Sequence, residues 1–127
     1  MRRSDQRRDA AFALYQRDVT GRDLDELLAG AKPFTRELAE GVDRHLDELD
    51  REIAGLARGW ELDRIAPLER SIMRVALYEI HHRRDEVPLE VAIDEAVGLA
   101  KEYCGADAPA FVNGILGSAA RELEARR

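Results

Sequence analysis

The residues best suited to chemistry are four arginines at the amino end of the chain: Arg2, Arg3, Arg7 and Arg8. A guanidinium group donates a fork of hydrogen bonds to phosphate and can stack on a nucleobase. An accessible aromatic side chain nearby would add stacking worth about 1–3 kcal/mol per base. Tyr15 is the nearest candidate along the chain. This pattern is consistent with a surface for single-stranded nucleic acid.

A plainer interpretation of the same residues stays open. Arginines at a chain end are often only a solvated terminus, and Tyr15 and Phe111, the second aromatic candidate, could both be core residues. Residues 1–8 carry a formal charge of +3, which leaves −9 for the rest of a chain whose total is −6. The distribution therefore allows a small basic patch on an acidic body.

Sites for catalysis or cofactors are not apparent in the sequence. It has no glycine-rich phosphate loop, no Gly-x-Ser-x-Gly elbow and no His-Glu-x-x-His motif. On a helix, His81 and His82 would point about 100° apart and could not share a metal. His45 and its neighbour Glu48 are typical of a solvated face. The single cysteine, Cys104, excludes an internal disulfide. We expect no enzyme activity, no metal and no cofactor.

Composition and periodicity favour one ordered, all-α domain. The 127 residues are 45% apolar, with four prolines and few β-branched runs. No apolar run approaches the roughly 20 residues that span a membrane, and no signal peptide is apparent. We therefore expect a cytoplasmic protein without membrane contact. Apolar residues at helical spacing predict helices over residues 4–18, 23–28, 34–58, 67–81 and 88–104, and a last helix after Pro109.

The densest apolar pattern runs from Ile65 to Leu116, and the other helices are expected to pack on it. Within it, Tyr103 is a candidate for an inward stripe. Trp60, just before it, is expected to cover the base of the helix that begins at Pro67. Neither half of the chain is long enough to bury much apolar surface alone. A weak division near Gly59 would give subdomains of about 1–59 and 60–127.

Three segments of this sequence resemble the NusB family of bacterial transcription antitermination factors. They are LERSIMRVALYEI (68–80), VPLEVAIDEAVGLAKEY (87–103) and FVNGIL (111–116), and the amino-terminal RRDAAFALYQRDVTG (7–21) resembles the family as well. The chain departs at Met73, Asp94 and Gly98, where the family usually has Leu, Asn and Glu. The resemblance implies seven helices in two roughly perpendicular three-helix subdomains.

The resemblance also implies a function and a set of site residues. NusB-like proteins bind the boxA element of ribosomal RNA leader transcripts together with NusE, a small-subunit ribosomal protein, in a complex with NusA, NusG and RNA polymerase. The family's arginine-rich segment would contact RNA. Carried over by position, the implied RNA-binding residues are Arg2, Arg3, Arg7, Arg8 and Tyr15. The implied RNA and NusE surface also includes Glu69, Asp107 and Phe111.

Two other functions stay open at this stage. Some NusB-like proteins self-associate, so the chain could be a homodimeric interaction module with weak or no RNA binding. A NusB-like domain also precedes some rRNA cytosine methyltransferases. We expect that alternative to fail, because the sequence ends at Arg127 without a methyl-donor fold.

Overall fold

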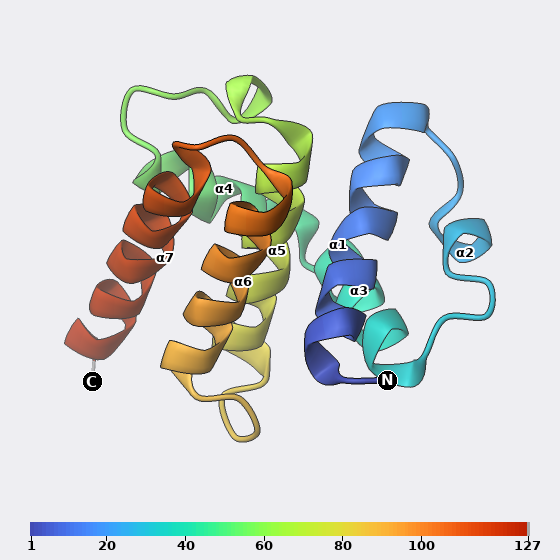
Figure 1. Ribbon diagram of the computed structural model, residues 1–127. Helices are drawn as coiled ribbons and strands as arrows, with labels where there is room; N and C mark the ends of the chain where they lie inside the picture. Colours follow the sequence, from blue (N-terminus) through green and yellow to red (C-terminus); the bar gives the residue numbers. More distant parts are fainter. Residues whose placement is uncertain (127) are drawn as a thin grey trace.

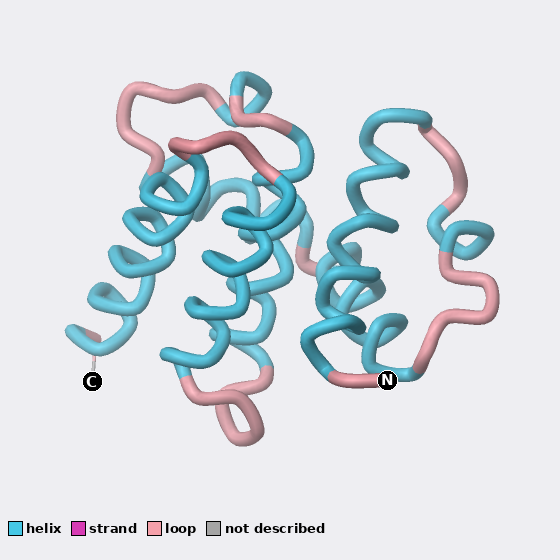
Figure 2. Tube along the Cα trace, viewed as in Figure 1, coloured by secondary structure: helices cyan, strands magenta, loops and turns pink. Residues whose placement is uncertain are grey.

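The computed structural model describes residues 1–126 as helices joined by short loops (Figure 2). No strand occurs among these residues, which confirms the predicted all-α class. The described part contains seven α-helices and one 3-10 turn: α1 (Arg3–Thr20), α2 (Leu24–Leu27), α3 (Pro33–Arg44), α4 (Leu46–Leu56), η1 (Leu62–Arg64), α5 (Pro67–His82), α6 (Leu89–Tyr103) and α7 (Ala108–Ala125).

Proline and glycine mark several of the helix ends. Pro33, Pro67 and Pro109 lie in the first turns of α3, α5 and α7. Proline has no backbone N–H group, and in the first turn of a helix that group would have no intrahelical acceptor. Gly21 ends α1 in the left-handed region, with φ 73°, and its N–H bonds the carbonyl of Arg17. A side chain would disfavour this conformation, so glycine suits the position.

The single helix predicted over residues 34–58 is wrong, because it is divided at His45 into α3 and α4. The His45 backbone, at φ −113° and ψ 21°, leaves helical geometry. Its N–H is shared between the carbonyls of Gly41 and Val42. The break lets α3 pack on α1 and α5 while α4 packs on α5 and α7. Apolar spacing continues across His45, so the periodicity gave no sign of the break.

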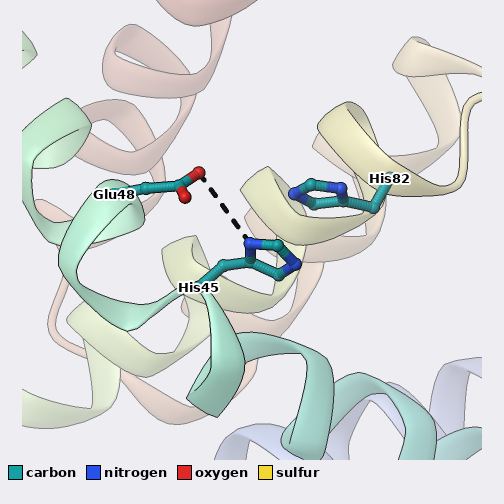
Figure 3. Close-up of side chains that lie close together, drawn as sticks. All are labelled: His45, Glu48 and His82. Carbon is teal, nitrogen blue, oxygen red and sulfur yellow. Dashed lines mark ion pairs between the residues drawn. The ribbon is translucent and has the colours of Figure 1, made fainter.

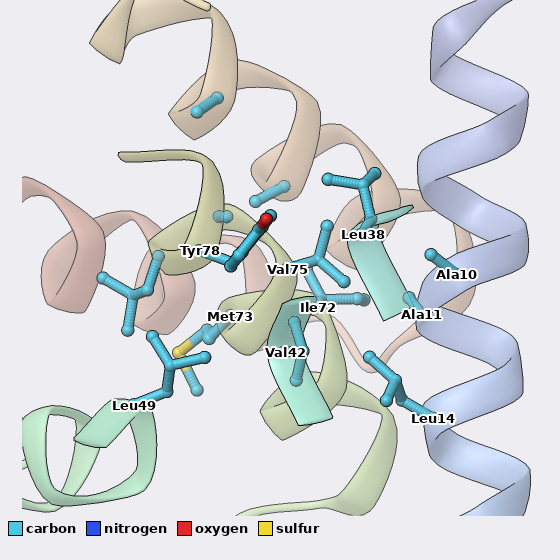
Figure 4. Close-up of a cluster of buried hydrophobic side chains, with 14 of the residues drawn as sticks. Ala10, Ala11, Leu14, Leu38, Val42, Leu49, Ile72, Met73, Val75 and Tyr78 are labelled. Carbon is cyan, nitrogen blue, oxygen red and sulfur yellow. The ribbon is translucent and has the colours of Figure 1, made fainter. Parts of the chain in front are cut away.

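Helix α5 is the centre of the core and packs against α1, α3, α4, α6 and α7. Its residues 71–80 are all buried, as expected for a helix enclosed on every side. Figure 4 shows Ile72, Met73 and Val75 of α5 among apolar side chains from α1, α3 and α4. Two charged residues, Arg74 and Glu79, are buried in the same helix and therefore need partners.

In Figure 1, α1, α2 and α3 lie on one side of α5, and α6 and α7 lie on the other, with α4 behind. α4 packs on α5 and α7 although it precedes Gly59. The division near Gly59 and the perpendicular arrangement of two subdomains stay predictions. Within residues 1–126, no helix is long and apolar enough to cross a membrane.

Candidate nucleic-acid interface

Arg7, one of the four arginines expected to contact RNA, does not lie on the outer surface of α1. It is 5% exposed, and its guanidinium group faces Glu79 of α5. Arg7 Nε donates to both carboxylate oxygens of Glu79 at 2.9 and 3.1 Å, and Nη2 donates to Oε2 at 2.9 Å. Glu95 of α6 is a second partner, at 3.5 Å. A side chain enclosed in this way cannot reach an RNA phosphate, so Arg7 is a structural residue.

The other three arginines remain at the surface near the start of α1. Arg2 is 82% exposed in its side chain and lies 3.6 Å from Asp5. Arg3 lies over the ring of Phe34, with its guanidinium carbon 4.2 Å from the ring centroid. Arg8 pairs with Asp5 at 3.4 Å and Asp9 at 3.1 Å. Exposed pairs of this kind are worth only about 0–1 kcal/mol. A phosphate could therefore displace these carboxylates at little cost.

Arg2 and Arg8 line a recess between the start of α1 and the length of α6. The α6 side is mainly acidic, because Asp94, Glu95 and Glu102 line it, and Tyr103 lies at its end. The basic edge therefore faces an acidic helix. Because of this contrast, the α1 rim of the recess is electrostatically more favourable for an anion than its α6 wall.

Tyr15 opens onto a second recess, where it is 36% exposed. Phe12 and Tyr103 stand beside it, with ring centroids 5.0 Å apart in an edge-to-face arrangement. Tyr103 is 39% exposed rather than inward-facing as predicted from periodicity. Tyr15 and Tyr103 thus offer aromatic surface that a base could stack on.

Glu69, Asp107 and Phe111 line a third recess, together with Trp60. Trp60 lies near the base of α5, as predicted, but it is 53% exposed, and its ring centroid lies 5.9 Å from that of Phe111 in an edge-to-face contact. Burial raises the pKa of Glu69, which indicates a partly dehydrated carboxylate. Such a group readily accepts a hydrogen bond from an incoming donor.

The three recesses adjoin one another, because successive recesses share lining residues. Tyr103 belongs to the first and second, and Ala66 and Glu69 belong to the second and third. We call this surface the α1–α7 groove. Its lining includes all of the sequence-predicted site residues except Arg7, which is buried, and Arg3, which packs on Phe34. Tyr103 and Trp60 were missed, because periodicity and position favoured packing roles for them.

The sequence model of the NusB family matches residues 4–121 of this chain. The chain belongs to the NusB family. Transcription antitermination protein NusB of Symbiobacterium thermophilum is 42% identical and the alignment covers 98% of this chain and 92% of the relative. The protein of the same name from Rubrobacter xylanophilus is also 42% identical, over 91% of this chain and 88% of its own length.

Solved NusB structures share the fold. The structure of T. maritima NusB superposes with a TM-score of 0.89 at 31% identity, over 96% of this chain and 92% of its own. A second match is a crystal structure of the antitermination factors NusB and NusE in complex with dsRNA. It superposes with a TM-score of 0.77 at 27% identity, over 93% of this chain and 96% of that one. These matches agree with the all-α fold predicted from the sequence.

Proposed function

We propose that this protein is a non-enzymatic transcription antitermination factor that binds boxA-type RNA of rRNA leader transcripts together with NusE. The observation that carries this proposal is the NusB family match over residues 4–121. The likeness to a chain crystallised as a complex of NusB, NusE and RNA supports it. The role implies a cytoplasmic location, where bacterial transcription takes place.

The α1 rim of the groove is the proposed contact for the RNA backbone. Arg2, Arg3 and Arg8 supply guanidinium groups there, and their present partners are surface carboxylates. Tyr15, exposed further along α1, is positioned to stack on a base. Arg7 is excluded from this set by its burial against Glu79.

The far end of the groove suits a protein partner better than a phosphate. Glu69 and Asp107 are acidic, and the aromatic pair of Trp60 and Phe111 adds apolar surface beside them. Aromatic anchors next to charges complementary to a basic partner are typical of protein interfaces. We assign this end to NusE. NusA, NusG and RNA polymerase would join through the assembled RNA complex.

A titration of labelled boxA-type RNA, with and without NusE, tests this function. Neutralising phosphate-binding arginines reduces the salt dependence of single-strand binding by roughly 0.7 per contact. The triple variant Arg2→Ala, Arg3→Ala and Arg8→Ala should therefore bind weakly and lose a log–log slope of about 2. Arg51→Ala, at an exposed α4 position outside the groove, is the matched control.

Two outcomes would redirect the assignment. If the triple variant binds RNA as well as the parent protein at low and high salt, the arginine rim has no role in RNA binding. A dimer in sedimentation experiments would then favour the homodimeric interaction module. For the NusE end, Asp107→Asn should reduce the gain in RNA affinity that NusE provides, while binding of RNA alone stays unchanged.

A further inference from the structure

Two histidines and a glutamate lie together where the α3–α4 break meets the end of α5 (Figure 3). His45 is the residue at the break, Glu48 is in the first turn of α4, and His82 is the last residue of α5. His45 Nδ1 lies 3.8 Å from Glu48 Oε2. The imidazole rings of His45 and His82 are stacked with centroids 4.0 Å apart. None of these residues lines the α1–α7 groove.

We propose that His45, Glu48 and His82 bind a divalent transition-metal ion of the Zn²⁺ class. One ligand atom from each residue lies within 4.8 Å of the others. Two imidazole nitrogens and one carboxylate oxygen form a common protein ligand set for zinc, with the remaining position taken by water. Imidazole ligands favour Zn²⁺ and its transition-metal neighbours over Mg²⁺ or Ca²⁺, which prefer oxygen.

The distances require only side-chain rotation to form such a site. Tetrahedral ligands about 2.1 Å from a metal lie roughly 3.4 Å from one another, so ligand atoms up to 4.8 Å apart must draw together by as much as about 1.4 Å. The two stacked imidazole rings must also turn so that one nitrogen of each points at the ion. The side chain of Glu48 is 67% exposed and His82 is also exposed, so both can rotate. The backbone positions are already held by the first turn of α4 and the last turn of α5.

A third histidine stands next to His82 in the sequence. His81 points elsewhere and pairs with Glu52 of α4 at 2.7 Å, so it is not part of the ligand set.

The predicted result of metal binding is a link between two segments that meet only through side chains. The ion would join the α3–α4 break to the carboxyl end of α5 and stabilise the folded state by an amount that grows with the logarithm of its concentration above the dissociation constant. This effect is independent of RNA binding, because the site and the groove share no residue.

Calorimetric titration of the full chain with ZnCl₂, combined with thermal unfolding, tests the site. The parent protein should bind one Zn²⁺ per chain and gain melting temperature, and Mg²⁺ should produce no such gain. His82→Asn and Glu48→Gln should each weaken Zn²⁺ binding at least about tenfold. His81→Asn is the matched control, because it removes the adjacent imidazole but no ligand, and it should keep the parent affinity.

Lowering the pH supplies a second readout. Zn²⁺ affinity should fall as the pH is lowered, because protons compete with the metal for its ligand nitrogens. The proposal is overturned if Zn²⁺ gives no saturable binding at one ion per chain. It is also overturned if His82→Asn and Glu48→Gln both bind Zn²⁺ as tightly as the parent protein.

Discussion

Replacing Arg7 by methionine should destabilise the fold, whereas the neighbouring substitution Arg8→Met should not. Arg7 and Glu79 are both almost fully buried and share three hydrogen bonds of 2.9–3.1 Å. Removing one member of a buried pair strands the other charge and costs about 3–5 kcal/mol. Arg8 pairs with carboxylates that are themselves partly exposed, so its loss should cost no more than about 1 kcal/mol.

Urea unfolding followed by far-ultraviolet circular dichroism measures this difference directly. The double variant Arg7→Met, Glu79→Leu should recover most of the lost stability, because an apolar pair of similar volume often replaces a buried ion pair without loss. Equal unfolding free energies for Arg7→Met and Arg8→Met would refute the assignment of Arg7 to the interior. A double variant no more stable than Arg7→Met would show that the stranded Glu79 charge is not the cause.

The destabilisation by Arg7→Met should also depend on pH. Burial raises the pKa of Glu79, while the hydrogen bonds and charge of Arg7 lower it, so removing Arg7 raises this pKa further. A carboxyl group with a folded pKa above its unfolded value stabilises the fold when protonated and loses that contribution as the pH rises. The stability deficit of Arg7→Met should therefore shrink as the pH is lowered from neutrality toward the ordinary glutamate pKa of about 4.3. A deficit that grows over this range would contradict the reasoning.

Three further predictions concern other parts of the molecule. Gly41→Ala should lower the unfolding free energy by about 1–3 kcal/mol, because the added Cβ would lie 2.2 Å from Cζ of Tyr78. Gly55 has open space around it, so Gly55→Ala should raise the unfolding free energy by about 0.5–1 kcal/mol in the same urea assay. Arg74→Met should lower it by about 1–3 kcal/mol, since this buried arginine binds two aspartates at 2.7 and 2.6 Å. Burial raises the pKa of Cys104, so alkylation of this thiol at neutral pH should be slower than that of an unhindered thiol. Bound RNA should slow the alkylation further, because Cys104 lines the groove.

Much of the fold could be predicted from the sequence because it depends on apolar spacing. The pattern from Ile65 to Leu116 predicted the central helix and its two successors, which Figure 1 shows side by side. The break at His45 could not be predicted in this way. The break depends on how α3 and α4 pack against other helices. The apolar residues on both sides of His45 continue one regular pattern.

The site could be predicted only in part, because burial of a charge depends on residues distant in the sequence. Arg7 and Arg8 are adjacent, and only Arg7 falls at helical spacing with the buried residues Ala11 and Leu14. That spacing gives the face of the helix but not the partner that a buried charge needs. Arg7 is buried because Glu79, 72 positions away, lies opposite it. One signal did exist: Glu79 falls within the apolar run LYEI, where a carboxylate without an exposed face requires a cationic partner. The meeting of His45 with His82 had no such signal.

The enclosed position of α5 has a consequence for synthesis on the ribosome. α1 and α3 bury apolar faces against α5, so these faces have no partner until the chain has been made as far as Ile80. At ordinary translation rates, the interval between the end of α3 and that point is about 2–7 s. During this interval the apolar faces of the nascent amino-terminal helices would be exposed. Chaperones that bind nascent chains would then have their best opportunity to bind them.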